Sequence, residues 1–415
     1  MKDTKLLDTS KYVTNLPSRH RQGKVWQRIF FASTFVGIAA LGVLLLNIVN
    51  SAFGYVAVKN TINPEDLAIN KVPIEQLHQT DLVYILKNNL SDGLIRRLES
   101  EEDWEDRTRE EIYDLVFDRV IEPKVVDTWS LFDSIFNKDN ITATLQGKYP
   151  EAELQFRSWV SSDFLVNPQS PDPEIAGVRT AILGSLWTIG ITILFSFPLG
   201  VGAAIYLEEY ATETPLNRLI QTNINNLAGV PSIIYGMLGL AIFVRAMESF
   251  TSGTLFGLAD QTTANGRTII SAGMTLGLLV LPLIIINAQE AIKAVPKSLR
   301  QASFGMGATK WQTVWHHVLP NALPGILTGA ILAISRAIGE TAPLVVVGAS
   351  TFITFDPKSP FSKFTTLPIQ IWQWTARPQD EFRNIAAAAI LVLLGLLLSL
   401  NAAAIFLRNR YSTRD

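Results

Sequence analysis

Two ionisable side chains interrupt an apolar stretch near the carboxyl end of the sequence. Arg336 and Glu340 belong to the segment SRAIGETAPL, and their spacing of four predicts that both lie on one face of a helix. Charged groups in a membrane span are costly and usually face a cavity or a partner. A guanidinium matches the geometry of phosphate oxygens, and a carboxylate can orient it and accept a proton from hydrogen phosphate. The pair is therefore either part of an oxyanion pathway or a structural ion pair.

The polar segment 289–323 combines helix-forming and turn-forming residues. Pro296 is typical of a helix start, and Gly307 permits a sharp turn. Trp311–Val318 has the periodicity of an amphipathic helix, which Pro320 would end. Large apolar side chains among four basic residues suit either a helix anchored in the membrane interface or a helix that fits a groove on a partner. The residues expected on one face of the second helix are Trp311, Val314, Trp315 and Val318.

Long apolar runs indicate a chain that crosses a membrane several times, with an all-α polytopic fold. Each run is long enough for a helix to cross a hydrocarbon layer of about 30 Å. Gly273 with Gly277, and Gly325 with Gly329, are spaced four apart, which predicts close approach between helices. The six predicted spans are Ile29–Val49, Ala181–Leu207, Ile224–Val244, Ile269–Ala288, Pro324–Val347 and Ile385–Leu407.

The distribution of charge predicts which parts of the chain lie on each side of the membrane. Residues 50–177 hold 24 Asp and Glu against 12 Lys and Arg, although the whole chain has a net charge of only −2. The short segments expected inside hold 15 Lys and Arg, against five in the short outer loops, which predicts that both termini are cytoplasmic. The predicted divisions are a cytoplasmic segment 1–28, a first transmembrane helix 29–49 that is retained as a signal-anchor, an extracytoplasmic insert 50–177, a core 178–407 of five transmembrane helices that includes the loop 289–323, and a cytoplasmic tail 408–415.

The insert 50–177 has the composition of a water-soluble domain. Helical stretches are expected at Leu77–Leu98 and Trp104–Val120, and Pro168–Pro173 indicates a linker back into the membrane. The acidic run Glu99–Asp106 fits a solvated charged face better than a cation site.

Several kinds of chemistry are excluded by composition and spacing. The chain has no cysteine, which excludes disulfides, thiolate metal ligands and thiol nucleophiles. His316 and His317 are adjacent, so they face different sides of a helix and do not suit a single metal. The segment GMGATK at 305–310 lacks the spacing of a phosphate-binding G-x-x-x-x-G-K-[ST] loop. We therefore expect no catalytic residues, no metal site and no bound cofactor.

The segment 289–323 resembles the coupling motif of permeases of ABC importers, which reads E-A-A, three residues, G, nine residues, I-x-L-P. The corresponding residues are Gln301, Ala302 and Ser303, then Gly307, then His317 to Leu319 and Pro320. Three of them depart from the motif, namely Gln301, Ser303 and His317, and Gln301 removes a charge. The resemblance implies that this short helix inserts into a cleft of a separate ATPase subunit, which binds ATP and Mg.

Four further stretches resemble the PstA-type permeases of phosphate-specific ABC importers, whose fold has six spans of the type I importer class. The resemblance covers the chain from Gly177 onward and implies a substrate role for Arg336 and Glu340. It also implies three partners besides the lipid bilayer of a bacterial plasma membrane: a second homologous permease subunit (PstC type), a homodimeric ATPase (PstB type) and a soluble phosphate-binding protein (PstS type), with no nucleic acid. The stretches are GVPSIIYG, SRAIGETAPL, LPIQIW and AAAAILVLL.

Two other functions remain open at this point. The first alternative is a permease for sulfate, molybdate or tungstate, because the coupling motif does not distinguish oxyanions and only the stretches around GETAP and GVPSIIYG favour phosphate. The second alternative is a membrane-anchored scaffold or sensor whose working part is the 50–177 domain. Only the second alternative has no need of Gly307.

Overall fold

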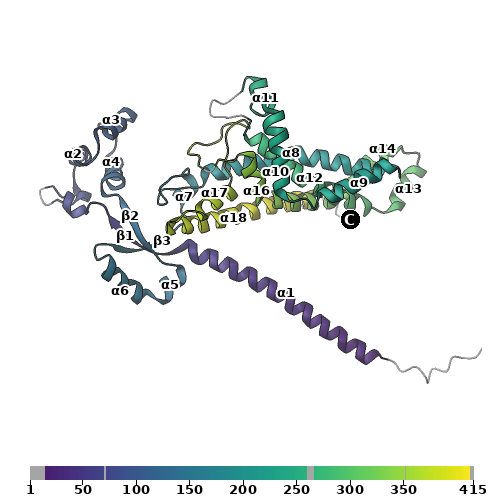
Figure 1. The fold of residues 1–415 in the computed structure, drawn as a ribbon, viewed down its shortest axis with the longest axis horizontal. Helices are drawn as coiled ribbons and strands as arrows, with labels where there is room; N and C mark the ends of the chain where they lie inside the picture. The colour runs from purple at the N-terminus through teal and green to yellow at the C-terminus, as the bar shows by residue number, and fades with distance from the viewer. Residues whose placement is uncertain (1–14, 70–71, 259–265, 351, 412–415) are drawn as a thin grey trace, which may run out of the picture.

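A bundle of long apolar helices forms the centre of the protein in a computed structural model that describes residues 15–69, 72–258, 266–350 and 352–411 (Figure 1). Within these residues, five helices are long and apolar enough to cross a membrane, or six if one bent pair counts as a span. The long helices are α1 (Leu16–Ala52), α8 (Arg179–Ile205, extended by the π-helical turn η5, Tyr206–Tyr210), α12 (Ile269–Lys293), α15 (Leu319–Ile338) and α18 (Asp380–Tyr411).

Helix α12 lies at the centre of the bundle, with two thirds of its most apolar window buried. Its glycines make this possible. A Cβ on Gly273 would lie 2.6 Å from Ile191 of α8, and one on Gly325 would lie 2.8 Å from Ala291. The predicted close approach at the glycine pairs is therefore confirmed.

The third predicted span, Ile224–Val244, is wrong as a single straight helix. The structure has α9 (Pro215–Leu227) and then α10 (Ser232–Gly239) with its π-helical extension η6 (Leu240–Ala246), bent by 109° at the break. Pro231 has no N–H to continue the first helix and disfavours helical geometry at the residue before it. Helix α10 then packs closely on α16 (Ala342–Val347).

The fifth predicted span, Pro324–Val347, is also interrupted. Helix α15 ends at Ile338, and α16 begins at Ala342 with Pro343 in its first turn. Thr341 and Pro343 lie at or next to this break, which begins one residue before Glu340. A short stretch of non-helical backbone therefore interrupts the predicted span.

The insert contains a small antiparallel sheet that the sequence analysis did not predict. Its strand order is β2-β1-β3, and β1 follows directly from the end of α1. The predicted helical stretch Leu77–Leu98 is divided at Leu90 and Ser91 into two helices. The elements are β1 (Phe53–Asn60), the short turns η2 (Pro64–Leu67) and η3 (Ile74–Gln76), α2 (Gln79–Asn89), α3 (Asp92–Glu101), α4 (Arg109–Val116), η4 (Phe117–Ile121), β2 (Pro123–Thr128), α5 (Leu131–Phe136), α6 (Lys138–Lys148), β3 (Glu153–Ser158) and α7 (Ser162–Val166).

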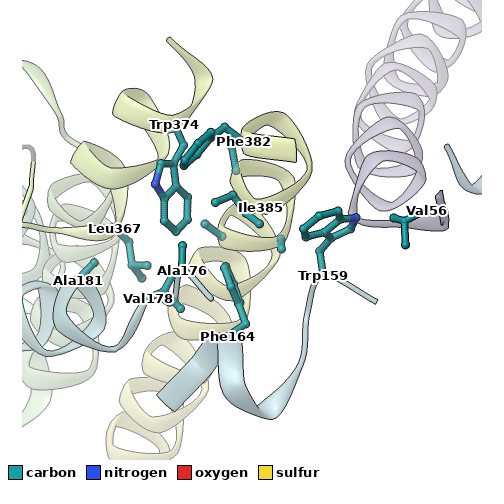
Figure 2. Packing of buried hydrophobic residues seen from close by; sticks show 13 residues of the cluster. Val56, Trp159, Phe164, Ala176, Val178, Ala181, Leu367, Trp374, Phe382 and Ile385 are labelled. Carbon is teal, nitrogen blue, oxygen red and sulfur yellow. The ribbon is translucent and has the colours of Figure 1, made fainter. Parts of the chain in front are cut away.

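Two hydrophobic cores divide the insert into a distal and a proximal part. The distal lobe, residues 62–121, has its own core, which includes Leu82, Trp104 and Ile112. The proximal part shares a core with the bundle: Figure 2 shows Val56, Trp159 and Phe164 beside side chains of α17 (Leu367–Thr375) and α18. Packing therefore crosses the predicted division at residue 177, whereas the distal lobe packs largely on itself. The shared core also includes Ala176, Val178, Ala181, Trp374, Phe382 and Ile385.

The distal lobe should be removable without unfolding the bundle. Thr61 N donates to Ile121 O at 2.8 Å, so the two ends of the lobe are adjacent. We expect that replacing residues 62–120 by an Asn-Gly turn converts β1 and β2 into a hairpin and leaves the thermal unfolding of the detergent-solubilised protein largely unchanged.

Phe164→Ala is the contrasting variant, because Phe164 packs on Trp374 in the shared core with ring centroids 6.1 Å apart. It should lower the free energy of unfolding by about 3–5 kcal/mol. Equal destabilisation by the deletion and by Phe164→Ala would contradict the division into two cores.

Candidate functional site

The predicted helix, turn and second helix are present in the segment 289–323. Helix α13 (Lys297–Gly305) begins after Pro296, and Gly307 turns the chain with φ of +81°. Thr309 then caps α14 (Lys310–Thr313) in a reciprocal capping box with Gln312. Each of these residues is of the type that its local geometry requires.

The prediction that Pro320 ends the second helix is wrong. Helix α14 continues through the π-helical turn η8 (Val314–Val318) into α15, so that residues 310–338 form one long helix. Leu319 N donates to Val314 O, five residues back, so the helix widens just before the proline. This wider turn accommodates a residue that has no N–H to donate.

The four residues predicted to share one apolar face of the second helix differ in burial: two are buried in the protein and two are exposed. Val314 and Val318 are buried, and Val318 belongs to a core that includes residues of α12. Trp311 and Trp315 are exposed and stacked on each other, with ring centroids 5.4 Å apart. The two valines hold the helix against the bundle, which leaves the two indoles available for a partner or for lipid.

The residues matched to the coupling motif are placed on different sides of α13 and α15. Gln301, Ala302, Gly307 and Pro320 are exposed, and Leu319 is half-buried. We call the exposed apolar and motif residues between Gln301 and Trp315 the coupling surface; the side chain of Met306 within it is 90% exposed. The coupling surface comprises Gln301, Ala302, Phe304, Met306, Gly307, Trp311 and Trp315.

Ser303 departs from the motif, and its side chain is buried and so cannot contact a partner. Its hydroxyl lies 2.8 Å from that of Thr313, so the pair joins α13 to α14 across the glycine turn. Either hydroxyl can donate, and both are buried. The replacement of alanine by Ser303 is therefore accounted for by a hydrogen bond within the segment.

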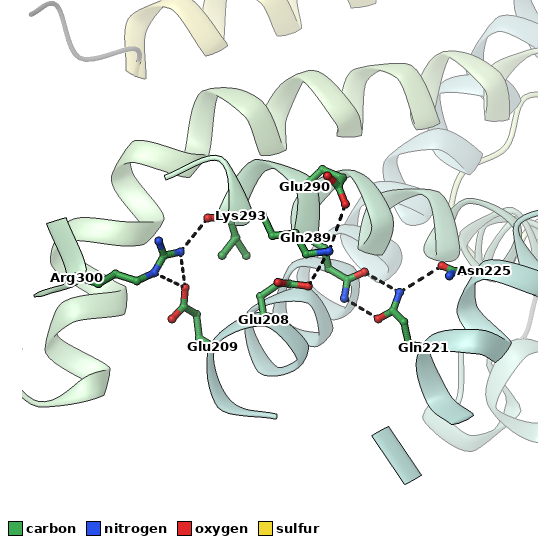
Figure 3. A network of polar contacts seen from close by, with 9 residues as sticks. Glu208, Glu209, Gln221, Asn225, Gln289, Glu290, Lys293 and Arg300 are labelled. Atoms are coloured by element: carbon green, nitrogen blue, oxygen red, sulfur yellow. Dashed lines mark hydrogen bonds and ion pairs between the residues drawn. The ribbon is translucent and has the colours of Figure 1, made fainter. Parts of the chain in front are cut away.

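A part-buried ion pair, which the sequence analysis missed, anchors α13 to the bundle (Figure 3). Arg300 donates to Glu209 through Nε at 3.0 Å and Nη2 at 2.7 Å, and also to the carbonyl oxygens of Ile292 and Val295. One guanidinium thus holds together η5, the end of α12 and α13. The sequence does contain a signal for this ion pair. Glu208 and Glu209 follow the second predicted span, on the side of the membrane where the basic segment 289–323 is expected.

Two further contacts reinforce this junction. Lys293 lies between Glu208 and Glu290 at 3.3 Å from each, and Lys310 lies over the ring of Tyr210. On the neighbouring side, the amides of Gln221 and Gln289 exchange two hydrogen bonds and so join α9 to α12 (Figure 3). A cavity of about 460 Å³ lies beside the junction, lined by Glu208, Glu209, Lys293, Lys297, Arg300 and Gln301.

Arg336 and Glu340 contact each other, but not from one helix face as predicted, because Arg336 is in the last turn of α15 and Glu340 lies in the break that follows. The Nε of Arg336 donates to Glu340 Oε1 at 3.4 Å, which is long for a charged hydrogen bond. The side chain of Arg336 is 45% exposed and that of Glu340 is 17% exposed. Within the described residues, the Nη groups of Arg336 have no hydrogen-bond partner, so the fork is open to a ligand.

No group of three or more His, Asp or Glu that could hold a metal occurs in the part of the chain that the structure describes.

At the start of α8, Arg179 pairs with Asp356 at 2.9 Å, and Thr180 donates to the same carboxylate. Arg179 is therefore neutralised within the chain, in contrast to the open guanidinium of Arg336.

Residues 196–412 match the family described as the binding-protein-dependent transport system inner membrane component. The chain belongs to this family. It is 32% identical to the probable ABC transporter permease protein YqgI of Bacillus subtilis, over 63% of this chain and 88% of that protein. The matched region begins within α8 and includes the coupling surface and the helices that follow, and it does not include the insert.

Two other relatives have names that state a substrate. The phosphate transport system permease protein PstC of Pasteurella multocida is 31% identical over 60% of this chain and 79% of its own length. PstA 1 of Mycobacterium tuberculosis, a phosphate transport system permease protein, is 33% identical over 57% of this chain and 71% of its own length. A solved chain of a bacterial alginate ABC transporter is more distant, at 16% identity and a TM-score of 0.45 over 68% of this chain and 92% of its own length. The sequence relatives carry the family assignment.

The hydrogen bond between Ser303 and Thr313 should show strong coupling in a double-mutant cycle. Ser303→Ala leaves a buried hydroxyl without its partner and should cost about 1–3 kcal/mol of stability. The double variant Ser303→Ala with Thr313→Val removes both hydroxyls and should recover most of that loss in thermal unfolding.

Ser298→Ala is the matched control, because Ser298 lies on the same helix and is exposed. It should leave the melting temperature unchanged. Additive losses in the double variant would show that the hydrogen bond does not stabilise the turn.

Proposed function

We propose that this chain is a membrane-spanning permease subunit, of PstA type, of an ABC importer that moves inorganic phosphate across a bacterial plasma membrane. The observation that carries the proposal is the similarity to phosphate transport permeases, whose own lengths are covered to more than two thirds. The chain itself is a transport subunit and not an enzyme; ATP and Mg bind to separate ATPase subunits.

The coupling surface is suited to receive a mechanical input from such an ATPase. Its apolar side chains protrude from α13 and α14, and a rigid turn at Gly307 connects the two helices. Burial of exposed Met and Trp side chains in a partner groove would supply affinity. We place a homodimeric ATPase of PstB type at this surface.

Arg300 provides the connection from the coupling surface to the transmembrane helices. It contacts η5 through Glu209 and the end of α12 through two backbone carbonyls, so a displacement of α13 reaches both helices. Four hydrogen bonds of one guanidinium connect these elements, so we expect them to move together. This rigidity supports alternating access driven by closure of the ATPase.

Arg336 is proposed to contact phosphate in the pathway. Its Nη groups present two donors at the geometry of two phosphate oxygens, and Glu340 holds the other side of the guanidinium. Glu340 could also accept a proton from hydrogen phosphate as the anion passes. The rest of the phosphate pathway would be lined by a second homologous permease subunit of PstC type. A soluble PstS-type phosphate-binding protein would dock on the outer side, and both termini would lie in the cytoplasm.

Gly307→Ala should reduce transport-coupled ATP hydrolysis, because alanine is strained at φ of +81° although the structure has open space around the position. The control is Gly305→Ala: Gly305 lies in α13 with equally open surroundings and an ordinary helical φ. We expect phosphate uptake in reconstituted vesicles to fall for Gly307→Ala and to persist for Gly305→Ala.

Unchanged uptake in Gly307→Ala would contradict docking through this turn. It would instead favour a scaffold or sensor that works through the insert.

Arg336→Gln should abolish uptake of radiolabelled phosphate while the complex still assembles, since the substitution removes the charged fork but keeps a polar side chain. Arg383→Gln is the control, because Arg383 forms a surface pair with Asp380 outside the proposed pathway. Excess sulfate should not compete with phosphate in the unmodified protein.

Two outcomes would count against this assignment. Loss of assembly in Arg336→Gln would make Arg336 and Glu340 a structural pair. Effective competition by sulfate would assign the importer to a different oxyanion.

A further inference from the structure

Helix α5 of the insert exposes an apolar face that no part of this chain covers among the described residues. Phe132, Ile135 and Phe136 are 48%, 60% and 73% exposed. Their spacing of three and four places them on one side of the helix, and the two phenylalanine rings are stacked with centroids 6.3 Å apart. A six-residue helix with three exposed large apolar residues requires an explanation other than its own folding.

The opposite face of α5 is fixed to the sheet. Ser134 is buried, and its hydroxyl accepts a hydrogen bond from Tyr55 N at 2.8 Å in β1. The same hydroxyl donates to Ser130 O within the helix. Because this polar face is held against β1, the apolar face must point away from the sheet.

The position of α5 relative to the membrane follows from a contact with α1. Asn50 follows directly after the apolar run Ile29–Val49, and its Oδ1 accepts a hydrogen bond from Phe132 N at 2.7 Å. No residue in the apolar window of α1 is buried within this chain, as expected for a helix that faces lipid or other subunits. Helix α5 lies beside the end of α1 in Figure 1. It is therefore at the depth where the hydrocarbon layer ends.

We propose that α5 inserts Phe132, Ile135 and Phe136 into the interfacial layer of the bilayer and so fixes the proximal part of the insert to the membrane. Aromatic and aliphatic side chains on one face are typical of helices that lie in this layer, at a depth of about 5–10 Å. The neighbouring charges are Asp133, Lys138 and Asp139, which are not basic overall. Insertion is thus driven by apolar area and does not depend on anionic lipid.

The proposal can be tested by site-directed spin labelling, because the chain has no cysteine and each introduced cysteine is labelled alone. The variants are Ile135→Cys and Phe136→Cys, with Tyr84→Cys as control. Tyr84 is 62% exposed on α2 in the distal lobe, away from α1 (Figure 1). The full-length chain is reconstituted in phosphatidylethanolamine–phosphatidylglycerol vesicles, and collisions with oxygen and with a water-soluble nickel complex are measured.

We expect labels at residues 135 and 136 to collide more with oxygen and less with nickel than the label at residue 84. The ratio should not change as the phosphatidylglycerol fraction is varied. High nickel accessibility at 135 and 136 would overturn the proposal by placing the face in water. Low accessibility to both reagents would also overturn it, because the face would then be covered by another subunit or a second copy of this chain.

Discussion

Helix α12 can lie between α8 and α15 only because small residues let the backbones approach. A Cβ on Gly273 would collide with Ile191, and one on Gly325 would press on Ala291. In a bilayer no hydrophobic effect drives apolar helices together, so association depends on such close contacts. The placement of the neighbouring spans follows from this central packing, since α8, α9, α10 and α15 all pack on α12.

The same helix connects the bundle to the coupling surface. Arg300 of α13 donates to Ile292 O at the end of α12 and to Val295 O just beyond it, and it pairs with Glu209. One side chain thus holds the end of α12, neutralises a part-buried carboxylate and positions the exposed turn at Gly307. Residues that contact neither the substrate nor the partner therefore determine how a force would pass from the partner to the substrate pathway.

The two parts of the insert depend on the bundle to different degrees. Its proximal sheet shares a core with α17 and α18 through Trp159 and Phe164, so it is part of the folded transmembrane unit. The distal lobe closes its own core and joins the sheet through adjacent chain ends. This arrangement explains how a large acidic block interrupts the chain between two spans without disturbing the packing around α12.

Hydropathy and spacing by themselves determined the membrane-spanning helices, the glycine contacts and the helix–turn–helix around Gly307, because these features depend on local periodicity and on residue type. Only the tertiary structure decided the 109° bend before α10, the continuation of the helix through Pro320 and the burial of Ser303. It also decided the partnership of Arg300 with Glu209, two residues far apart in the sequence. Pro231 and the paired acids after the second span indicate a break and a charged partner, but the bend angle and the partner itself depend on which distant backbone or side chain fills a space or accepts a hydrogen bond.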